Sequence, residues 1–298
     1  MGLSSRQLEA FSEVARTGSF SQAAKNLFVT QSALSQRVRH LEDEMATALI
    51  VRDPAGLRLT AAGEALLRYC HVRESLEAEV LTSIASGHET LGGVIRVAGF
   101  SSVTRSVVIP ALSVLAAEYP SVNIEVFTRE VRDLARMLSR NEVEVIVTSE
   151  PSSRQEIVSY DLGFEENVLV ESSKIRGSKA DIYLDHDPED PTTSQFFKIN
   201  GDSKKKIRRN YLDEVYAIID GVKLGMGRAV LPLHLVASHK DLRVVKGYKP
   251  LKIPVYLQYF RQPYYSRLHT VLIDTLRAKA VVSVHVNEGR LTGKSSRP

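Results

Sequence analysis

The residue types best suited to recognition chemistry lie between Gln31 and Glu42. If this segment is a helix, its apolar residues recur at three- and four-residue steps along one face: Leu34, Val38 and Leu41. The other face carries hydroxyl, amide, guanidinium and imidazole groups: Ser32, Ser35, Gln36, Arg39 and His40. Amides and guanidiniums read base edges, and hydroxyls and guanidiniums also bind phosphates. The segment therefore predicts a helix that enters the major groove of DNA.

Two further helices are expected to position this recognition helix. The first runs from about Ser5 to Thr17 and ends at Gly18, and the second begins at Ser21 as its N-cap. Residues 28–30 supply a tight turn whose last residue is suited to cap the recognition helix. Capped amphipathic helices also build other small domains, so spacing alone leaves open a three-helix domain that does not bind DNA.

A specific pattern of residues surrounds this helix pair. Its members are Leu8, Phe11, Val14, Ala15, Gly18, Ser19, Phe20, Ala23, Ala24, Leu27, Gln31, Ser32, Leu34, Ser35, Leu41, Glu42, Arg52, Thr60 and Gly63. Together they resemble the N-terminal signature of LysR-type transcriptional regulators. The chain departs from that signature at Met45-Ala46, where the family usually has Leu-Gly, and at Leu49-Ile50-Val51, where it usually has Leu-Phe before the Arg. The first departure affects the turn into the wing.

The resemblance implies a winged helix-turn-helix domain at residues 1–60, with residues 53–59 as the wing. This segment contains seven Lys or Arg residues and six Asp or Glu residues, so its net charge is close to zero. Any basic surface must therefore come from where the charged residues lie. The residues expected to contact double-stranded promoter DNA come from the recognition helix, its cap and the wing: Thr30, Gln31, Ser32, Ser35, Gln36, Arg37, Arg39, Arg52 and Arg58.

A long helix is predicted from about Ala61 to Ser86, capped by Thr60. Its apolar residues recur at roughly three- and four-residue steps: Ala62, Leu66, Tyr69, Leu76, Val80 and Ile84. Such a helix is about 39 Å long and exceeds what a small domain covers. The resemblance implies a linker at 61–90 that pairs with its copy in a homodimer, with a homotetramer formed from two dimers. A helix that docks within its own chain is the alternative.

Residues 91–285 alternate between strand and helix patterns, which predicts an α/β region with a largely parallel sheet. The resemblance implies a periplasmic-binding-protein-like effector-binding region with two subdomains: subdomain I at about 93–162 and 266–285, and subdomain II at about 163–265. The expected fold class is thus α + α/β. Strands predicted in subdomain II include Phe196–Ile199, followed by a helix from Tyr211 to Leu224. The tail at 286–298 has the composition of a disordered segment.

Polar residues that follow the predicted strands suggest a small-molecule site between the subdomains. Open α/β sheets bind ligands at the carboxyl ends of their strands, and hydroxyls with free backbone N–H groups hold carboxylates or other anions there. The expected lining residues are Ser101, Ser102, Thr104, Thr128, Arg129, Thr148, Glu150 and Asn200. The preferred set is Ser101, Ser102, Thr128 and Thr148. Loop polars and helix caps have the same types, so structural roles for part of this set stay open.

Residues 31–37 and 49–52, with the late aromatic strand at 255–260, resemble the branch of the family that controls export of basic amino acids. That resemblance implies lysine or arginine as the effector, with Glu150 facing the ligand's positive group, and contact with RNA polymerase if the protein activates transcription. An architectural DNA-binding protein without an effector is the alternative. A small-molecule enzyme is disfavoured because no nucleophile elbow, P-loop or paired-carboxylate motif is present.

The remaining composition points to a cytoplasmic regulator with no cofactor. The 298 residues, 43% of them hydrophobic, suffice for two or three packed domains. Cys70 is the single cysteine, which fits a reducing compartment, and we interpret it as a half-buried helix residue rather than a redox sensor. The eight His residues show no metal-ligand spacing, and neither a signal segment nor an apolar run long enough to span a membrane is visible.

Overall fold

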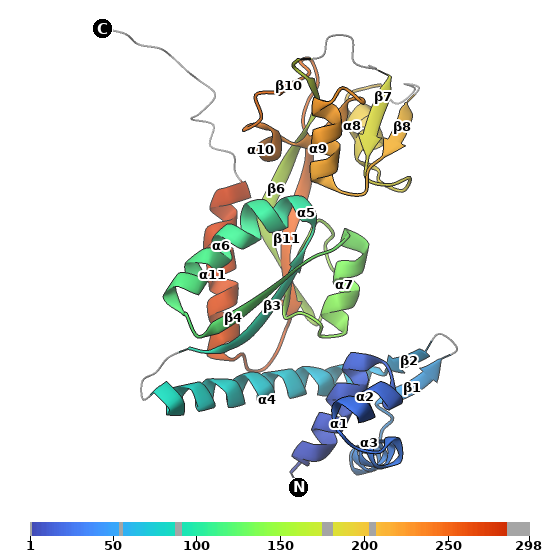
Figure 1. Cartoon of the computed structure of the whole chain (residues 1–298), viewed down its shortest axis with the longest axis vertical. Helices are drawn as coiled ribbons and strands as arrows, with labels where there is room; N and C mark the ends of the chain where they lie inside the picture. Colours follow the sequence, from blue (N-terminus) through green and yellow to red (C-terminus); the bar gives the residue numbers. More distant parts are fainter. Residues whose placement is uncertain (1, 54–55, 87–90, 175–180, 203–206, 285–298) are drawn as a thin grey trace.

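The computed structural model describes residues 2–53, 56–86, 91–174, 181–202 and 207–284. The molecule is elongated (Figure 1): the N-terminal domain lies at one end, the long helix α4 (Ala61–Ser86) crosses beside it, and the α/β region extends away. The predicted tail at 286–298 lies outside the described residues.

The N-terminal domain has the predicted order of three helices and a hairpin. It comprises α1 (Ser5–Thr17), α2 (Phe20–Asn26), α3 (Gln31–Met45), β1 (Ile50–Asp53) and β2 (Gly56–Leu59). Leu34, Val38 and Leu41 are buried, as their spacing predicted. They share one core with side chains of α1, α2 and α4.

Local backbone chemistry sets the ends of these helices. Gly18 ends α1 in the left-handed conformation at φ +64°, and Thr30 caps α3 by accepting a hydrogen bond from the backbone N–H of Ala33 at 3.2 Å. The prediction of Ser21 as the cap of α2 was wrong. Ser19 is the cap, because its side chain accepts from the N–H of Gln22.

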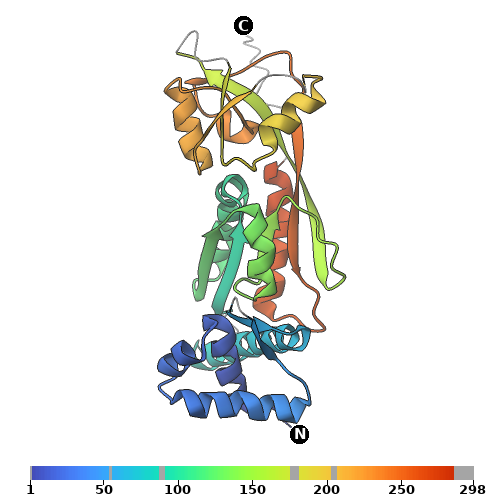
Figure 2. The ribbon, with the colours of Figure 1, turned by 90° about the vertical axis from the view of Figure 1, so that its right-hand side faces the viewer.

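Subdomain I is a sheet covered on both faces. Its strands β3 (Gly93–Gly99), β4 (Val122–Thr128) and β5 (Val145–Thr148) are parallel, with β3 in the middle. Figures 1 and 2 show α6 (Ile109–Glu118) and α11 (Arg267–Val284) on one face and α7 (Val131–Ser139) on the other. Between β3 and α6 lie the short α5 (Ser101–Val103) and a π-helical turn, η1 (Thr104–Val108).

Two long strands join the subdomains. β6 (Ile157–Ser172) and β11 (Leu251–Phe260) run antiparallel through both halves, with an irregularity between Val255 and Tyr256. The seven-stranded sheet has the order β10-β6-β11-β5-β3-β4, with β9 also paired to β6. It is therefore mixed rather than largely parallel, because the crossing strands and their partners β9 and β10 pair antiparallel.

Subdomain II surrounds the far ends of the crossing strands. Its elements are β7 (Ile182–Asp185), α8 (Thr192–Ile199), β8 (Arg208–Tyr211), α9 (Val215–Lys223), β9 (Ala229–Pro232), α10 (Leu233–Val236) and β10 (Leu242–Val244). The predicted strand at 196–199 was wrong, since these residues form the last turn of α8. The predicted helix from Tyr211 begins four residues late, because Tyr211 ends β8 and Glu214 caps α9. Gly225, the residue after the C-cap Leu224 of α9, has φ +75°.

Candidate DNA-binding surface and effector site

The polar face of α3 is open to solvent. Ser32, Gln36, Arg39 and His40 are exposed, while Ser35 and Arg37 are partly covered. The capping bond of Thr30 holds the first turn, and the side chains of Thr30 and Ser32 lie 3.1 Å apart. Gln31 accepts a hydrogen bond from the Ser21 hydroxyl at 3.1 Å, which ties the start of α3 to α2. The later part of this face thus presents an amide and a guanidinium that are free to turn toward bases or phosphates.

The wing follows α3 through an unusual turn. Ala46 ends α3 in the left-handed conformation at φ +49°, where the family usually has glycine, so the departure from the signature retains the backbone shape. Glu42 accepts hydrogen bonds from the N–H groups of Leu49 and Ile50 and holds the entry to the hairpin. In the hairpin, Arg52 lies on β1, and Arg58 pairs with Asp53 at 3.3 Å while 70% of its side chain stays exposed.

Phe28 is a surface feature that the sequence reasoning did not single out. It lies in the turn between α2 and α3, is 95% exposed, and has φ +54°. Bulky residues seldom adopt this conformation, and apolar groups seldom lie fully in water. The positive φ of Phe28 cannot be read from the sequence, so no signal marked it. It places an exposed apolar group in the turn that leads into α3.

The predicted effector residues of subdomain I gather at one edge of its sheet. Gly99 pairs with both Thr128 and Val147, so the carboxyl ends of β3, β4 and β5 coincide. Arg129 donates its backbone N–H to the carbonyl oxygen of Gly99 at 3.1 Å. The expected set Ser101, Ser102, Thr104, Thr128, Arg129 and Thr148 is therefore assembled along this edge, which we call the ligand edge.

Two serines of the ligand edge bridge to carboxylates of subdomain II. The Ser101 hydroxyl donates to Glu214 Oε1 at 3.2 Å, and the Ser102 hydroxyl donates to Glu165 Oε2 at 3.1 Å. Glu165 belongs to β6, and Glu214 caps α9. Sequence reasoning found neither acid, because each lies more than 60 positions from its serine. The signal available was the pair Glu165-Glu166, which directly precedes the apolar second half of β6.

Glu165 and His234 form an incompletely satisfied pair. Oε1 of Glu165 lies 3.5 Å from Nε2 of His234, yet neither atom has a hydrogen-bond partner among the described residues. Burial raises the pKa of Glu165 to about 7, although its bond from Ser102 opposes the rise. Burial also lowers the pKa of His234. The Thr104 hydroxyl is likewise buried without a partner within the described chain. These groups suit a polar ligand at the junction.

Further contacts cross the junction on both sides. The Arg105 guanidinium lies 4.1 Å from the centre of the Tyr216 ring. On the other side, Arg132 of α7 pairs with Glu189 at 3.1 Å and with Asp187 at 3.7 Å. The described structure is therefore one in which the subdomains already touch.

The remaining predicted effector residues have other surroundings. Thr148 is buried and its hydroxyl accepts from the N–H of Glu150, whose side chain is exposed and whose carbonyl accepts from Gln258. Asn200 does not follow a strand. It ends α8, donates to the carbonyls of Phe196 and Lys249, and accepts from the N–H of Lys249. None of these bonds of Asn200 reaches subdomain I, and they give it a structural role.

Cys70 is fully buried in the N-terminal core, more deeply than the half-buried position expected. It is 1% exposed, and burial raises its pKa to about 12, so the reactive thiolate is suppressed.

Within the described residues, no group of three or more His, Cys, Asp or Glu side chains is arranged to hold a metal ion. In the same part of the chain, no helix combines the length and apolar character needed to cross a membrane.

Comparison with known proteins agrees with this architecture. Residues 5–64 match the bacterial regulatory helix-turn-helix proteins of the lysR family, and residues 88–281 match the LysR substrate binding domain. The transcriptional regulator HdfR of Yersinia enterocolitica is 31% identical over 52% of this chain, and the match spans 53% of HdfR, about half its length. YusT of Bacillus subtilis, named as an uncharacterized transcriptional regulator, is 26% identical over 92% of this chain and 93% of its own.

Solved structures share the fold. ArgP from Mycobacterium tuberculosis superposes with a TM-score of 0.73 at 24% identity, covering 94% of this chain and 98% of ArgP. Full-length LysG from Corynebacterium glutamicum with bound effector Arg gives a TM-score of 0.73 at 20% identity, covering 94% of this chain and 99% of LysG. The relatives are named as regulators and not as enzymes, in agreement with the expectation from sequence. The second family match alone covers more than half of the residues, so the chain belongs to the LysR family of bacterial regulatory helix-turn-helix proteins.

Proposed function

We propose that this protein is a transcriptional regulator that binds promoter DNA through α3 and responds to lysine or arginine bound at the subdomain junction. The DNA-binding half of the proposal rests on the exposed polar face of α3, opposite its buried Leu34, Val38 and Leu41. The contacting residues proposed are those predicted from the sequence. RNA polymerase is the expected partner if binding activates transcription.

The observation that carries the effector assignment is the buried carboxyl of Glu165. It faces His234, has one oxygen without a hydrogen-bond partner in the described structure, and lies on the same junction as Glu214. A buried carboxyl is stabilised in its charged form by a cation placed against it. The hydroxyls of Ser101 and Thr104 suit the ligand's carboxylate at the ligand edge. Glu165 thus replaces the exposed Glu150 as the proposed partner of the ligand's positive group.

One solved structure with this fold was determined with a basic amino acid bound. LysG is described with arginine as its bound effector, and it superposes on this chain over 94% of the residues. At 20% identity this likeness shows a shared fold and nothing about the ligand. The proposal of a basic ligand therefore rests on the acidic side chains at the junction. Ligand binding alters DNA binding only if the two arrangements of the protein bind the ligand with different affinity. A ligand bound across the junction, where Ser101 contacts Glu214, would favour the arrangement in which the subdomains touch.

Calorimetric titration of the full chain with lysine and arginine tests this function. Both should bind, and norleucine and citrulline, which lack the side-chain charge, should bind at least about tenfold more weakly. Glu165→Gln should weaken binding of lysine by a similar factor. Glu166→Gln is the matched control, because Glu166 is the next residue of β6 and pairs with Lys252 at 3.6 Å outside the junction.

Equal binding of lysine and norleucine, or equal loss in the two variants, would refute the basic ligand. A protein that binds its promoter but is stabilised by no amino acid would instead be the ligand-independent architectural protein.

A further inference from the structure

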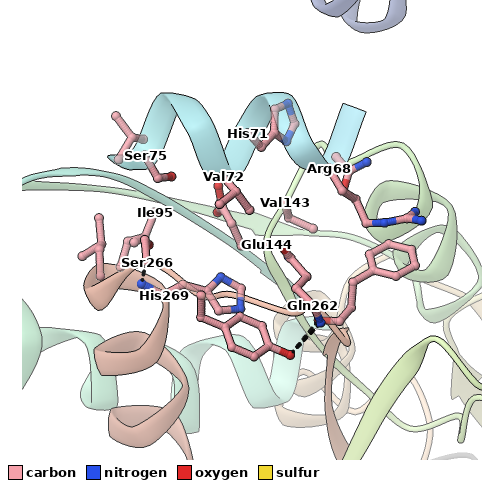
Figure 3. Close-up of a pocket in the computed structure, with 15 residues that line it drawn as sticks. Arg68, His71, Val72, Ser75, Ile95, Val143, Glu144, Gln262, Ser266 and His269 are labelled. Carbon is pink, nitrogen blue, oxygen red and sulfur yellow. Dashed lines mark hydrogen bonds between the residues drawn. The ribbon is translucent and has the colours of Figure 1, made fainter. Parts of the chain in front are cut away.

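A second recess lies away from the subdomain junction, between α4 and subdomain I. The recess is partly open to solvent, and Figure 3 shows side chains of α4, including Arg68 and His71, on one side. His269 and Ser266, at the start of α11, lie on the other side, with Glu144 between the two groups. The recess is therefore lined by two parts of the molecule that are far apart in sequence.

Contacts on both sides of the recess hold α4 against subdomain I. Near the start of α4, Glu64 pairs with Arg154 at 3.4 Å. Farther along, Glu79 accepts a hydrogen bond from the backbone N–H of Leu268 at 2.9 Å. Between them, the Arg68 guanidinium lies 4.4 Å from the centre of the Phe260 ring. A molecule in the recess would touch both parts and would favour this placement of α4.

Three of the residues that line the recess each have a side-chain nitrogen that is buried without a hydrogen-bond partner among the described residues. These nitrogens are Arg68 Nη1, Asn141 Nδ2 and His269 Nε2. His269 is only 8% exposed, and its ring is stacked on Tyr265 with centroids 5.0 Å apart. Buried polar atoms normally have partners, and the nitrogens of Arg68 and Asn141 can only donate, so they point to a ligand with oxygen acceptors.

The other lining groups narrow the chemistry of that ligand. Val72, Ile95 and Val143 provide an apolar wall. Glu144 does not present a free negative charge, because its carboxyl accepts from the backbone N–H of Arg96 and lies 3.7 Å from Arg96 Nη1. Burial also raises the pKa of Glu144 to about 7. The guanidinium of Arg68 keeps its positive charge at neutral pH.

We infer that this recess binds a small organic carboxylate, with its apolar body against the valines and its oxygens toward the unpaired nitrogens. Such a ligand would be a second input, separate from the amino acid at the subdomain junction. It would stabilise the position of α4 against subdomain I, and α4 is joined directly to the N-terminal domain. The inference does not depend on the identity of the junction ligand.

Calorimetric titration of the full chain with hexanoate tests the inference, with hexanamide as the neutral match. Hexanoate should bind, and hexanamide should bind at least about tenfold more weakly, because a charge-assisted hydrogen bond is lost. Arg68→Gln should weaken hexanoate binding by at least about tenfold, and Arg68→Lys should recover part of it. Arg73→Gln is the matched control, since Arg73 lies on the same helix, does not line the recess and pairs with Glu77.

A second variant tests the recess with a substitution that the backbone tolerates, in case Arg68→Gln lowers binding by disturbing the fold. Asn141 has φ +51°, so Asn141→Gly removes the amide at a position where glycine is tolerated, and it should also weaken binding. Hydrogen exchange with hexanoate should slow at residues 68–75 and 262–269, not at 101–104. Absence of hexanoate binding, equal loss in Arg68→Gln and Arg73→Gln, or protection confined to 101–104 would overturn the inference.

Discussion

Glu165 and Glu166 are neighbours on β6 but differ in surroundings. Glu165 is 4% exposed, bonds to Ser102 and faces His234, whereas Glu166 pairs with Lys252 at the surface. Alternation along a strand places successive side chains on opposite faces, which explains the difference. A buried carboxyl with an incomplete set of partners is costly for folding and useful for binding, so its titration is the most direct test at this scale.

The first prediction concerns the pH dependence of stability. The pKa of Glu165 is raised from 4.5 to about 7 in the folded state, so its favourable contribution is complete below pH 4.5 and is lost as pH rises through 7. Gln cannot titrate. Relative to the original protein, Glu165→Gln should therefore gain unfolding free energy as pH rises across this window, by up to about 3 kcal/mol.

Chemical denaturation of both proteins at several pH values measures this difference. The two proteins must be compared because buried histidines also make stability depend on pH. Burial lowers the pKa values of His71 and His269 to about 4, so these residues lower the unfolding free energy of both proteins as pH falls below 6.5. Glu166→Gln, at the next residue of β6, is the control variant measured alongside. A difference between Glu165→Gln and the original protein that does not change with pH would mean that Glu165 is already charged in the folded state.

The second prediction separates base reading from phosphate binding on α3. Gln36→Ala should lose discrimination between the chosen site and random DNA by about 1–3 kcal/mol, because an amide can pair with a base edge. Arg39→Ala should weaken binding to both DNAs and flatten the salt dependence. Fluorescence anisotropy at several salt concentrations measures both effects. Equal losses on both DNAs for Gln36→Ala would remove the assignment of Gln36 as a base-reading residue.

The sequence allowed us to predict which residues share a site when they follow neighbouring parallel strands. It did not allow this for residues that come together only when distant elements pack. Ser101, Thr128 and Thr148 could be grouped because parallel strands end at a common edge. Glu165 and His234 could not, because their closeness arises only when β6 and α10 pack at the junction. Asn200 was misplaced because the apolar run before it was read as a strand.

At the scale of elements, α4 carries two kinds of surface. Its first half buries Leu66, Leu67 and Cys70 in the N-terminal core. Its second half leaves large apolar side chains in water: Leu76 is 45%, Val80 57%, Leu81 67% and Ile84 74% exposed. Exposed apolar side chains that recur along one helix mark a surface suited to association. The dimer predicted from sequence thus has a candidate contact, and it stays a prediction.

The third prediction tests that contact. Val80→Glu should shift the full chain from dimer toward monomer, since it places a charge in an apolar interface and does not touch the core. Sedimentation equilibrium measures the change. Glu77→Gln on the same helix is the control, because Glu77 is 59% exposed and bonds only weakly to Arg73 at 3.6 Å. If Val80→Glu leaves the association constant unchanged, the pairing of subunits lies elsewhere.

The fourth prediction concerns how α4 joins the wing. A Cβ atom added at Gly63 would lie 2.1 Å from the backbone oxygen of Leu49, so α4 approaches the backbone just before β1 too closely for any side chain at this position. Gly63→Ala should lower the unfolding free energy by about 1–3 kcal/mol and weaken DNA binding. Thermal melting checks the first effect. Ala65→Ser at an exposed position of the same helix should change little, and a Gly63→Ala protein of unchanged stability would contradict this packing.

Elements with clear periodicity or caps were predictable, and short apolar runs were not. The stretch Phe196–Ile199 is apolar and brief, which fits a strand or a buried helical turn equally well. Phe196 and Phe197 both pack in a cluster with Tyr248, and this tertiary contact favours the helix. The two long crossing strands were also missed in length, because β6 contains polar residues where it passes between subdomains.

At the scale of the whole molecule, α4 connects the α/β region, which holds both proposed ligand sites, to the N-terminal domain. It shares the N-terminal core, and it contacts subdomain I through Arg68, Glu64 and Glu79. Within one chain, we expect a change at either proposed site to reach the DNA-binding surface by moving or fixing this helix. If two subunits pair through α4, the distance between their α3 helices then depends on how α4 is seated.

The fifth prediction follows from that arrangement. Selection of bound sequences from a random DNA pool should yield a site with two-fold symmetry, because a symmetric dimer presents two copies of α3 to DNA. Half-sites should be spaced by one helical turn, about 10 base pairs, or a multiple of it. Selection with lysine or arginine present should keep the half-site sequence and alter the preferred spacing or the affinity. The bases read by α3 do not change, whereas the separation of the helices does. Recovery of single half-sites would contradict the dimer, and half-site sequences that change with the ligand would contradict transmission through α4.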